Sequence, residues 1–167
     1  MPETLLISDA ELLPFGSVEN LATRGLALLE QQKRTWELLA RNYAALGGVR
    51  TRKVEYDGFA VELQFNPARL TSAAAKVDPK SIRERPCFLC NLPPEQRGQI
   101  FAEDYLVLCN PFPIFPEHFT IVNRRHVPQR VAASFAPLLD LAEAMNARHT
   151  VFYNGPKCGA SAPDHLH

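Results

Sequence analysis

The chain has 167 residues, of which 46% are hydrophobic, as is typical of one globular domain. Its 18 basic and 18 acidic residues cancel, so we do not expect it to bind a long nucleic acid. We find no apolar run long enough for a membrane span and no basic signal-peptide stretch, and four cysteines do not indicate a disulfide scaffold. We therefore expect a cytoplasmic protein without a membrane partner.

The N-terminal part of the chain has the periodicity of a helix. Ser17 is a favourable N-cap residue, and apolar residues recur from there at three- and four-residue steps until Gly47-Gly48. These residues are Leu21, Leu28, Leu29, Trp36, Leu39, Tyr43 and Leu46. The pattern predicts one helix from Ser17 to about Leu46 that packs on the core, with a partner-binding helix as the alternative. We treat residues 1–48 as a helical extension.

A β-hairpin is predicted next. The runs Val49–Tyr56 and Phe59–Phe65 are joined by Asp57-Gly58, which is a strong hairpin signal. Alternating apolar residues in the second run would form one apolar face. Residues 70–85 are polar and are predicted to form a long loop.

The C-terminal half combines strands with one helix. We predict strands at Tyr105–Cys109, His118–Asn123 and Thr150–Tyr153, and a helix over residues 134–147. Strands grouped in this way with few helices indicate an α+β protein with an antiparallel sheet, and not a doubly wound one.

Cys87 and Cys90 form a C-x-x-C pair, whose spacing lets both sulfur atoms bind one tetrahedral zinc ion. Pro93-Pro94 disfavours the helix that follows a thioredoxin-like redox pair. Two unrelated buried thiols are the other alternative. Two more ligands must come from His118, His126, His149, His165, Cys109 or Cys158. A zinc ion closed by four protein ligands would be structural.

Residues 154–167 contain a glycine-rich turn followed by His165 and His167. In a strand, these two side chains would project from the same face. The N–H groups of the turn suit a phosphate, and a histidine beside a bound phosphate can attack phosphorus and carry it covalently. A polar tail with two incidental histidines is the alternative reading.

In their order and spacing, these pieces resemble the histidine triad (HIT) superfamily. The resemblance covers roughly residues 50–167. It is carried by the C-x-x-C pair, Asn110 after a strand, Arg124-Arg125-His126 after the next strand, and Asn154, Gly159-Ala160-Ser161 and His165-Leu166-His167. It is closest to the transferase and phosphorylase branch, which includes galactose-1-phosphate uridylyltransferase, the diadenosine tetraphosphate phosphorylases and the GDP-hexose phosphorylases. It implies a HIT-like antiparallel sheet with flanking helices in residues 49–167.

The resemblance also implies a role for each matching residue. His167 would be the nucleophile that becomes nucleotidylated, oriented through its other ring nitrogen by a backbone carbonyl. The nucleotide would be bound by Asn110 at the ribose, by Asn154 near the nucleophile, and by Gly159 and the catalytic Ser161 at the phosphate. The ligands of a structural zinc ion would be Cys87, Cys90, His126 and His165, with His118 as the rival of His126.

The implied function is that of a nucleotidylyltransferase or phosphorylase acting on a nucleoside diphosphate sugar or a dinucleoside polyphosphate. Phosphate or a sugar phosphate would accept the nucleotidyl group from His167. A nucleotide hydrolase of the same fold and a non-catalytic, zinc-stabilised nucleotide-binding module are the alternatives.

The residue two positions past His167 would discriminate these readings, because it is a histidine in the hydrolase branch and usually a glutamine in the transferases. The chain ends at His167, inside the expected catalytic strand. We therefore expect an N-terminal portion of a longer protein or a truncated form, partnered by a second copy in a homodimer or by a missing C-terminal half.

Overall fold

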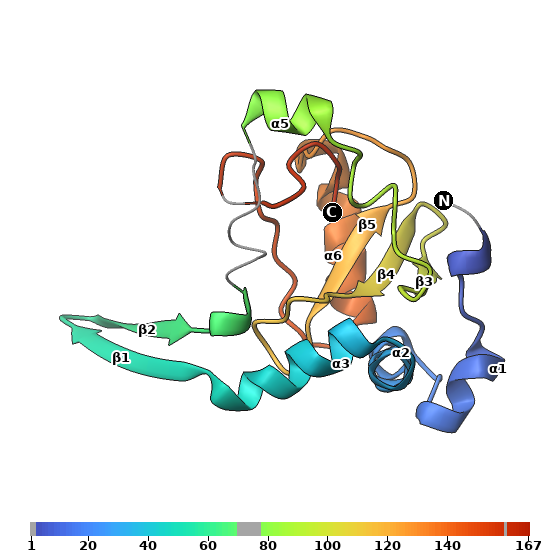
Figure 1. Ribbon diagram of the computed structural model, residues 1–167, viewed down its shortest axis with the longest axis horizontal. Helices are drawn as coiled ribbons and strands as arrows, with labels where there is room; N and C mark the ends of the chain where they lie inside the picture. Colours follow the sequence, from blue (N-terminus) through green and yellow to red (C-terminus); the bar gives the residue numbers. More distant parts are fainter. Residues whose placement is uncertain (1–2, 70–77, 159) are drawn as a thin grey trace.

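The computed structural model describes residues 3–69, 78–158 and 160–167 (Figure 1). The helices are α1 (Asp9–Leu12), α2 (Leu21–Thr35), α3 (Glu37–Ala44), α5 (Pro79–Glu84) and α6 (Phe135–Ala144), with short 3₁₀ helices η1 (Glu3–Leu5), η2 (Leu13–Phe15), η3 (Ala45–Gly48), η4 (Pro67–Arg69) and η5 (Ala132–Ser134). The strands are β1 (Arg50–Tyr56), β2 (Phe59–Phe65), β3 (Gly98–Phe101), β4 (Tyr105–Cys109) and β5 (Phe119–Asn123). They form two antiparallel sheets, β1-β2 and β3-β4-β5, so the predicted α+β class is confirmed.

The long N-terminal helix begins later than predicted, because Asn20 and not Ser17 is its N-cap. The side-chain oxygen of Asn20 accepts the backbone N–H of Thr23 at 3.0 Å. The Thr23 hydroxyl in turn accepts the N–H of Asn20 at 3.2 Å. This reciprocal pair satisfies two backbone donors at the start of α2.

The predicted single helix is in fact two helices that meet at Trp36. The backbone of Trp36 is extended, with φ −129° and ψ 99°, and its indole is buried. In Figure 1, α2 is seen end-on while α3 runs lengthwise, so the break changes the direction of the chain. Apolar periodicity continues through the break because residues of both helices reach one core.

These N-terminal helices share that core with the three-stranded sheet. The buried residues of this shared core are Ile7, Leu12, Ala27, Leu28, Leu29, Trp36, Leu39, Tyr43 and Cys109. A Cβ atom on Gly25 would lie 3.2 Å from the ring of Phe119, so α2 approaches β5 closely. The Tyr43 hydroxyl donates to the carbonyl of His118 at 3.0 Å, and the Asn42 amide donates to that of Pro111 at 2.7 Å. The helices therefore also hold the turn between β4 and β5.

The two faces of the β3-β4-β5 sheet are covered by different elements. On one face, Val107 packs with Leu141 and Met145 from α6 and its C-terminal end, and with Leu21 from α2. On the other face, Leu106, Leu108 and Val122 pack against Leu6, Leu89 and Leu92. The segment that carries the C-x-x-C pair thus lies on the face opposite α6.

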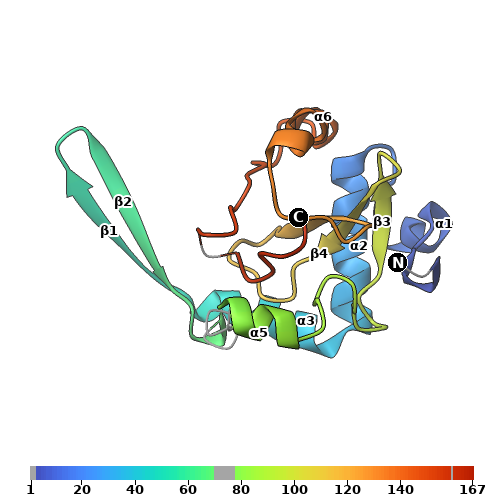
Figure 2. The ribbon, with the colours of Figure 1, turned by 90° about the horizontal axis from the view of Figure 1, so that it is seen from above.

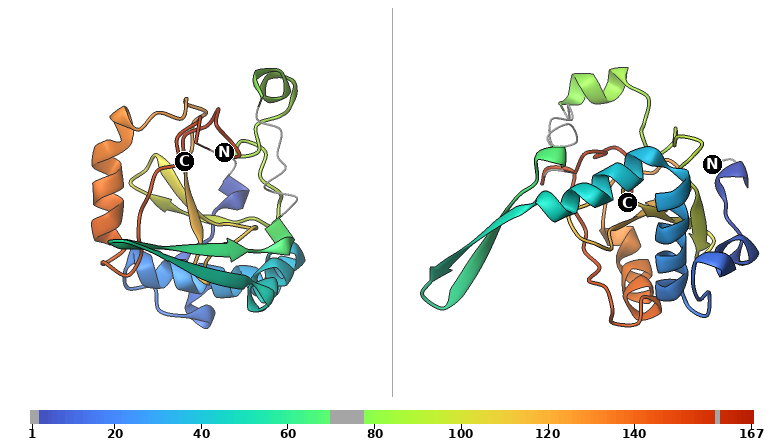
Figure 3. Two further views of the ribbon diagram at one scale, coloured as in Figure 1. Left: turned by 90° about the vertical axis from the view of Figure 1, so that its left-hand side faces the viewer. Right: turned by 60° about the horizontal axis from the view of Figure 1, so that its bottom comes forward.

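The β1-β2 hairpin forms as predicted, and Gly58 at its turn has a positive φ of 81°, which glycine adopts at little cost. Figures 1 and 2 and the right-hand view of Figure 3 show the hairpin projecting from the rest of the molecule. Most of its side chains are exposed on both faces.

The structure differs from the prediction in three further places. Part of the predicted loop is helix α5, capped by Asp78, while residues 70–77 lie outside the described residues. Strand β3 was not predicted, because a four-residue strand that begins with glycine has no clear alternation. Thr150–Tyr153 is not a strand. Among the described residues, no helix combines the length and apolar character that a membrane crossing requires.

Candidate metal centre and adjoining cavity

Four side chains from three distant segments meet at one point, namely Cys87, Cys90, His126 and His165. Their nearest ligand atoms all lie within 4.8 Å of one another. The Cys87 sulfur is 3.3 Å from Nδ1 of His165, and the Cys90 sulfur is 3.3 Å from Nδ1 of His126 and 3.4 Å from Nδ1 of His165. This is the four-residue set that the resemblance implied.

The spacing fits a tetrahedral metal ion. Zinc–sulfur bonds of about 2.3 Å and zinc–nitrogen bonds of about 2.0 Å at the tetrahedral angle place sulfur and nitrogen ligands about 3.5 Å apart. The observed sulfur–nitrogen distances of 3.3 to 3.4 Å are close to that value. Two cysteines and two histidines, all four of them protein side chains, form a group that can hold one metal ion.

The ring of His165 is held in the tautomer that a metal ligand needs. It is fully buried, and its Nε2 lies 2.7 Å from the backbone carbonyl oxygen of Asn123. A carbonyl only accepts hydrogen bonds, so Nε2 carries the proton and Nδ1 presents its lone pair to the sulfur atoms. Burial also lowers the pKa of His165, which favours the neutral ring.

The Cys87 thiol behaves differently with and without a cation. Burial raises the pKa of the Cys87 thiol to about 11, so in the absence of a metal it stays protonated. A bound cation reverses this preference, because it stabilises the thiolate directly. The chemistry of the donor set therefore couples metal binding to proton release.

The other candidate ligands lie elsewhere. His118 accepts the backbone N–H of Ile114 through Nδ1 at 3.2 Å, and Nε2 of His149 lies 2.9 Å from Glu117. Cys109 is buried in the core and Cys158 is exposed. Of the two rival histidines, His126 and not His118 joins the group.

Arg85 joins the two segments that carry three of these four side chains. Its guanidinium lies 3.1 Å from the Asp164 carboxylate and donates to the Ser161 carbonyl at 3.4 Å. The same guanidinium lies 3.9 Å from the centre of the Phe88 ring. Arg85 therefore links the C-x-x-C segment to the residues just before His165, a role that the sequence did not suggest.

His167 lies next to the metal group but belongs to a different site. Its Nδ1 is 2.9 Å from the carbonyl oxygen of His165. Residues 165–167 do not form a strand, although Leu166 makes one backbone hydrogen bond to Val127 and one to Asn123, both 2.9 Å long. The expected strand is therefore absent, and His165 belongs to the candidate metal-ligand group whereas His167 lines a cavity.

Gln129 fixes the backbone around His167, and no sequence pattern singled it out. Its side-chain oxygen accepts the N–H of His167 at 2.8 Å. Its amide nitrogen donates to the carbonyls of His167 at 3.1 Å and Asn154 at 2.9 Å. The side chain is 2% exposed. One buried amide therefore positions both the candidate nucleophile and the loop asparagine.

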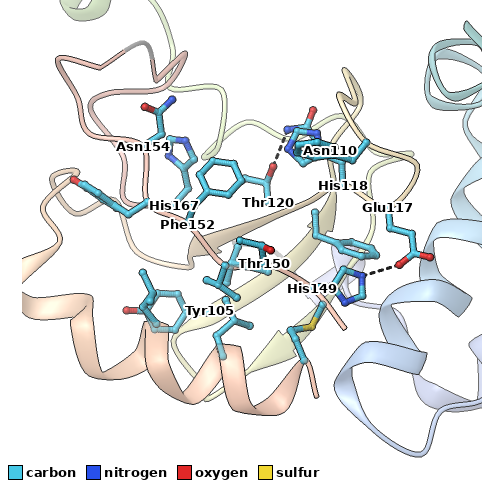
Figure 4. A pocket seen from close by; sticks show the side chains of 18 of the residues that line it. Tyr105, Asn110, Glu117, His118, Thr120, His149, Thr150, Phe152, Asn154 and His167 are labelled. Carbon is cyan, nitrogen blue, oxygen red and sulfur yellow. Dashed lines mark hydrogen bonds and ion pairs between the residues drawn. The ribbon is translucent and has the colours of Figure 1, made fainter. Parts of the chain in front are cut away.

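The cavity has a volume of about 970 Å³ and lies between the sheet, α6 and the C-terminal segment (Figure 4). Of the predicted nucleotide-site residues, Asn110, Asn154, Ser161 and His167 line it. Gly159 lies outside the described residues. Apolar lining is supplied by Phe119, Ile121, Leu138, Leu141, Met145 and Val151. The cavity can hold an organic ligand with a polar end at His167.

Both asparagines of the cavity are engaged within the protein. The oxygen of the Asn110 side chain accepts the N–H of Phe112 at 2.9 Å, and its nitrogen donates to Thr120 at 3.0 Å. The Asn154 amide, oriented to satisfy both groups, donates to the Cys158 carbonyl at 2.8 Å and accepts the N–H of Ala160 at 3.3 Å. They shape the turn after β4 and the loop before His165, respectively.

Two titratable groups that the sequence did not place in a cavity, His118 and Glu117, also line it. Burial, with a further contribution from Arg69, lowers the pKa of His118 to about 4, so this ring is neutral near pH 7. Glu117 accepts two hydrogen bonds from Arg148, at 2.7 and 3.3 Å, and these lower the pKa of its carboxyl group.

Comparison with known proteins identifies a family but no individual related protein. No curated protein and no solved structure matches the chain. Residues 28–167 match the family described as "Domain of unknown function (DUF4922)". The matched region includes all four candidate metal ligands and the lining of the cavity. Because it spans most of the sequence, the chain belongs to this DUF4922 family.

Proposed function

We propose that the chain is a HIT-like nucleotidyltransferase of the phosphorylase type, in which His167 carries the nucleotidyl group. The observation that supports this most is the 2.9 Å contact between His167 Nδ1 and the His165 carbonyl at the wall of the cavity. Since the carbonyl only accepts, Nδ1 keeps the proton and Nε2 has a free lone pair. A neutral ring held in this way can attack phosphorus without first losing a proton.

The reaction has two steps. In the first, Nε2 of His167 attacks the α-phosphorus of a nucleoside diphosphate sugar or a dinucleoside polyphosphate. The new N–P bond forms while the P–O bond to the departing phosphate group breaks, and the leaving oxygen keeps both electrons. In the second, an oxygen of phosphate or of a sugar phosphate attacks the same phosphorus, and the P–N bond breaks with its electrons returning to Nε2.

The surroundings of His167 suit this chemistry. Ser161 and Asn154 line the same cavity, and the Ser161 hydroxyl can stabilise charge on the equatorial phosphoryl oxygens. Gln129 orders the backbone on both sides of the reacting group, which favours a fixed angle of attack.

The metal centre has a structural role in this proposal. Cys87, Cys90, His126 and His165 would hold zinc, which when bound supplies folding energy and fixes His165. Since His165 also supplies the carbonyl that orients His167, an ordered metal centre keeps the candidate nucleophile in place.

Dependence on an acceptor tests the reaction type. The purified chain is mixed with nucleoside diphosphate sugars and dinucleoside polyphosphates, with and without inorganic phosphate, and the products are separated by chromatography. Transfer predicts nucleotide products only when phosphate or a sugar phosphate is present, and none from a His167→Ala variant. Equal turnover without any acceptor would instead favour a hydrolase.

A further inference from the structure

The β1-β2 hairpin has two chemically different sides. Opposed residues of a strand pair point to the same side, so four pairs share one surface, which we call the hairpin face. These pairs are Arg50 and Phe65, Arg52 and Leu63, Val54 and Val61, and Tyr56 and Phe59. The reverse side carries Thr51, Lys53, Glu55, Ala60, Glu62 and Gln64.

The apolar part of the hairpin face is open to solvent. Tyr56 and Phe59 are 56% and 61% exposed, and Leu63 and Phe65 are 53% and 54% exposed. None of the hydrophobic clusters formed by the described residues contains a hairpin side chain. Adjoining exposed apolar side chains mark an interaction site, and a two-stranded hairpin without a cover is only marginally stable in water.

The body of the molecule holds the reverse side of the hairpin. The Gln64 side chain donates to the carbonyl of Ile114 at 3.2 Å, and the Asn66 side chain, just after β2, donates to that of Pro113 at 3.4 Å. Both contacts lie at the base of the hairpin. Figures 1 and 2 show that the two strands then run clear of the helices and the central sheet, where a partner can reach them.

The hairpin face carries positive charge and no carboxylate. Arg50 and Arg52 lie two residues apart on β1, at the base of the hairpin. The acidic residues of the strands, Glu55 and Glu62, are on the reverse side, where Glu55 pairs with Lys53. Within the described ranges of the chain, neither arginine is paired with a carboxylate. The face therefore complements a surface that combines carboxylates with apolar side chains.

The hairpin face also has the dimensions of one α-helix. Two strands about 4.8 Å apart, together with their side chains, form a strip roughly 10 Å wide, which is about the diameter of a helix. Strands of 7 residues make the strip roughly 20 Å long, which a helix of about 14 residues covers. A helix is also a common cover for one face of an antiparallel sheet.

We propose that the hairpin face binds an amphipathic helix of a partner protein, whose apolar stripe ends in a cluster of carboxylates. The stripe packs on Tyr56, Phe59 and Leu63, and the carboxylates pair with Arg50 and Arg52. This proposal does not rest on the proposed catalytic activity.

The distribution of charge favours such a helix over other occupants. The same face of a second copy brings arginine against arginine. A nucleic acid strand needs cations along its whole length, whereas both arginines are at one end of the face. A lipid bilayer disfavours the outer part of the hairpin, where Asp57 in the turn and the Lys53–Glu55 pair are charged.

The test uses fluorescently labelled peptides of about 16 residues, in which leucine and phenylalanine recur at helical spacing. In the acidic peptides a cluster of glutamates follows the apolar stripe, at the N-terminal end in one version and at the C-terminal end in another. Control peptides carry lysines in place of these glutamates. Fluorescence anisotropy should give a Kd on the order of 10 µM for one acidic version, and binding at least about 10-fold weaker for its lysine control.

Matched variants then locate the binding surface. Arg52→Glu should reverse the preference, so that the lysine control binds better than the acidic peptide. Lys53→Glu, the next residue of the same strand but on the reverse side, should leave the preference unchanged. Leu63→Ser should weaken binding at least about 10-fold, whereas Ala60→Ser on the reverse side should not.

Several results would overturn the proposal. One is that no acidic peptide binds the wild-type chain, whether or not it binds a single-stranded oligonucleotide or vesicles of phosphatidylserine. Another is equal affinity for the acidic and the lysine peptides. A third is that Arg52→Glu and Lys53→Glu change the affinity equally. Circular dichroism establishes that each variant used in these comparisons is folded.

Discussion

His167 donates from its ring to the backbone carbonyl of His165, across 2.9 Å, so a candidate nucleophile is oriented by the backbone of a candidate metal ligand. His165 is itself fixed by the Asn123 carbonyl at 2.7 Å. The residues that hold the metal centre and those that shape the cavity are therefore neighbours in one short segment. Disturbing either site should be detectable at the other.

The metal centre predicts that Cys87→Ser loses bound metal and stability together. Metal analysis of the wild-type chain should find about one zinc ion per chain, because four protein ligands form one tetrahedral site. The variant should contain little zinc, and its Tm should fall by about 10 °C, since metal-binding energy is folding energy in such a site. Cys158→Ser is the matched control, because Cys158 is exposed and outside the group. Full zinc content in Cys87→Ser would remove this residue from the site.

Gln129 should stabilise the C-terminal segment through hydrogen bonds alone. Gln129→Met keeps the shape of the side chain but leaves the His167 N–H and two carbonyls without their partner. We expect a loss of about 2 to 3 kcal/mol of unfolding free energy in urea titrations, with zinc content unchanged.

Gln99→Met is the matched control for Gln129. Gln99 is also buried, but its amide makes one long hydrogen bond to Asp9, and among the described residues its side-chain oxygen has no partner. This substitution should cost less than about 1 kcal/mol. Equal losses in the two variants would show that the Gln129 network contributes nothing beyond ordinary packing.

Gly98 is required at the start of β3. A Cβ atom there would lie 2.6 Å from the Leu108 side chain and 2.8 Å from the Val107 carbonyl oxygen. Gly98→Ala should therefore lower the free energy of unfolding by about 2 to 3 kcal/mol, because the backbone oxygen cannot move aside. Gly47→Ala, where a Cβ would meet no atom within 4 Å, should be close to neutral. A Gly98→Ala chain as stable as the wild-type chain would contradict the close approach of Gly98 to Leu108 and Val107 in the β3-β4 pair.

Stability should depend on pH through His118. Its folded-state pKa is lowered to about 4 by burial, whereas the unfolded chain has the ordinary value of 6.5, so the unfolded state binds more protons between these values. Above pH 6.5 the ring is neutral in both states, and this group costs no stability. As the pH falls from 6.5 toward 4, the free energy of unfolding decreases, by about 3 kcal/mol at most.

His118→Asn tests this dependence, because the asparagine oxygen can still accept the Ile114 N–H. Urea titrations at pH 7 and pH 4.5 should show a smaller loss of stability in the variant than in the wild-type chain. Both proteins share the metal centre, so its own acid sensitivity cancels in the comparison. Identical pH dependence would mean that His118 is already protonated in the folded chain at pH 4.5.

Some features could be predicted because particular residue types carry a chemical or conformational requirement. Asp57-Gly58 predicted the hairpin, since the turn needs a positive φ. Cys87 and Cys90 could be paired because C-x-x-C spacing suits one metal ion, while His126 and His165 were added only through the resemblance to the histidine triad superfamily; the structure brings the four together. The α+β class followed from strands with few intervening helices.

Other features depend on tertiary contacts that leave no local pattern. The break at Trp36 preserves apolar periodicity, so the sequence could not separate two helices from one. Gln129 is an ordinary loop glutamine until folding brings it to Asn154 and His167. Thr150–Tyr153 has the composition of a strand, but in the structure it lines the cavity and forms no strand.

The central claim, that His167 becomes nucleotidylated, is tested most directly by intact-mass spectrometry of the purified, zinc-loaded chain. The chain is mixed with a panel of nucleoside diphosphate sugars and dinucleoside polyphosphates in the absence of an acceptor. We predict an acid-labile gain of one nucleotidyl group in the wild-type chain and in His149→Ala, which alters the same cavity, and no gain in His167→Ala. No gain with any compound in a folded, zinc-bound chain, or a gain that persists in His167→Ala, would contradict the claim.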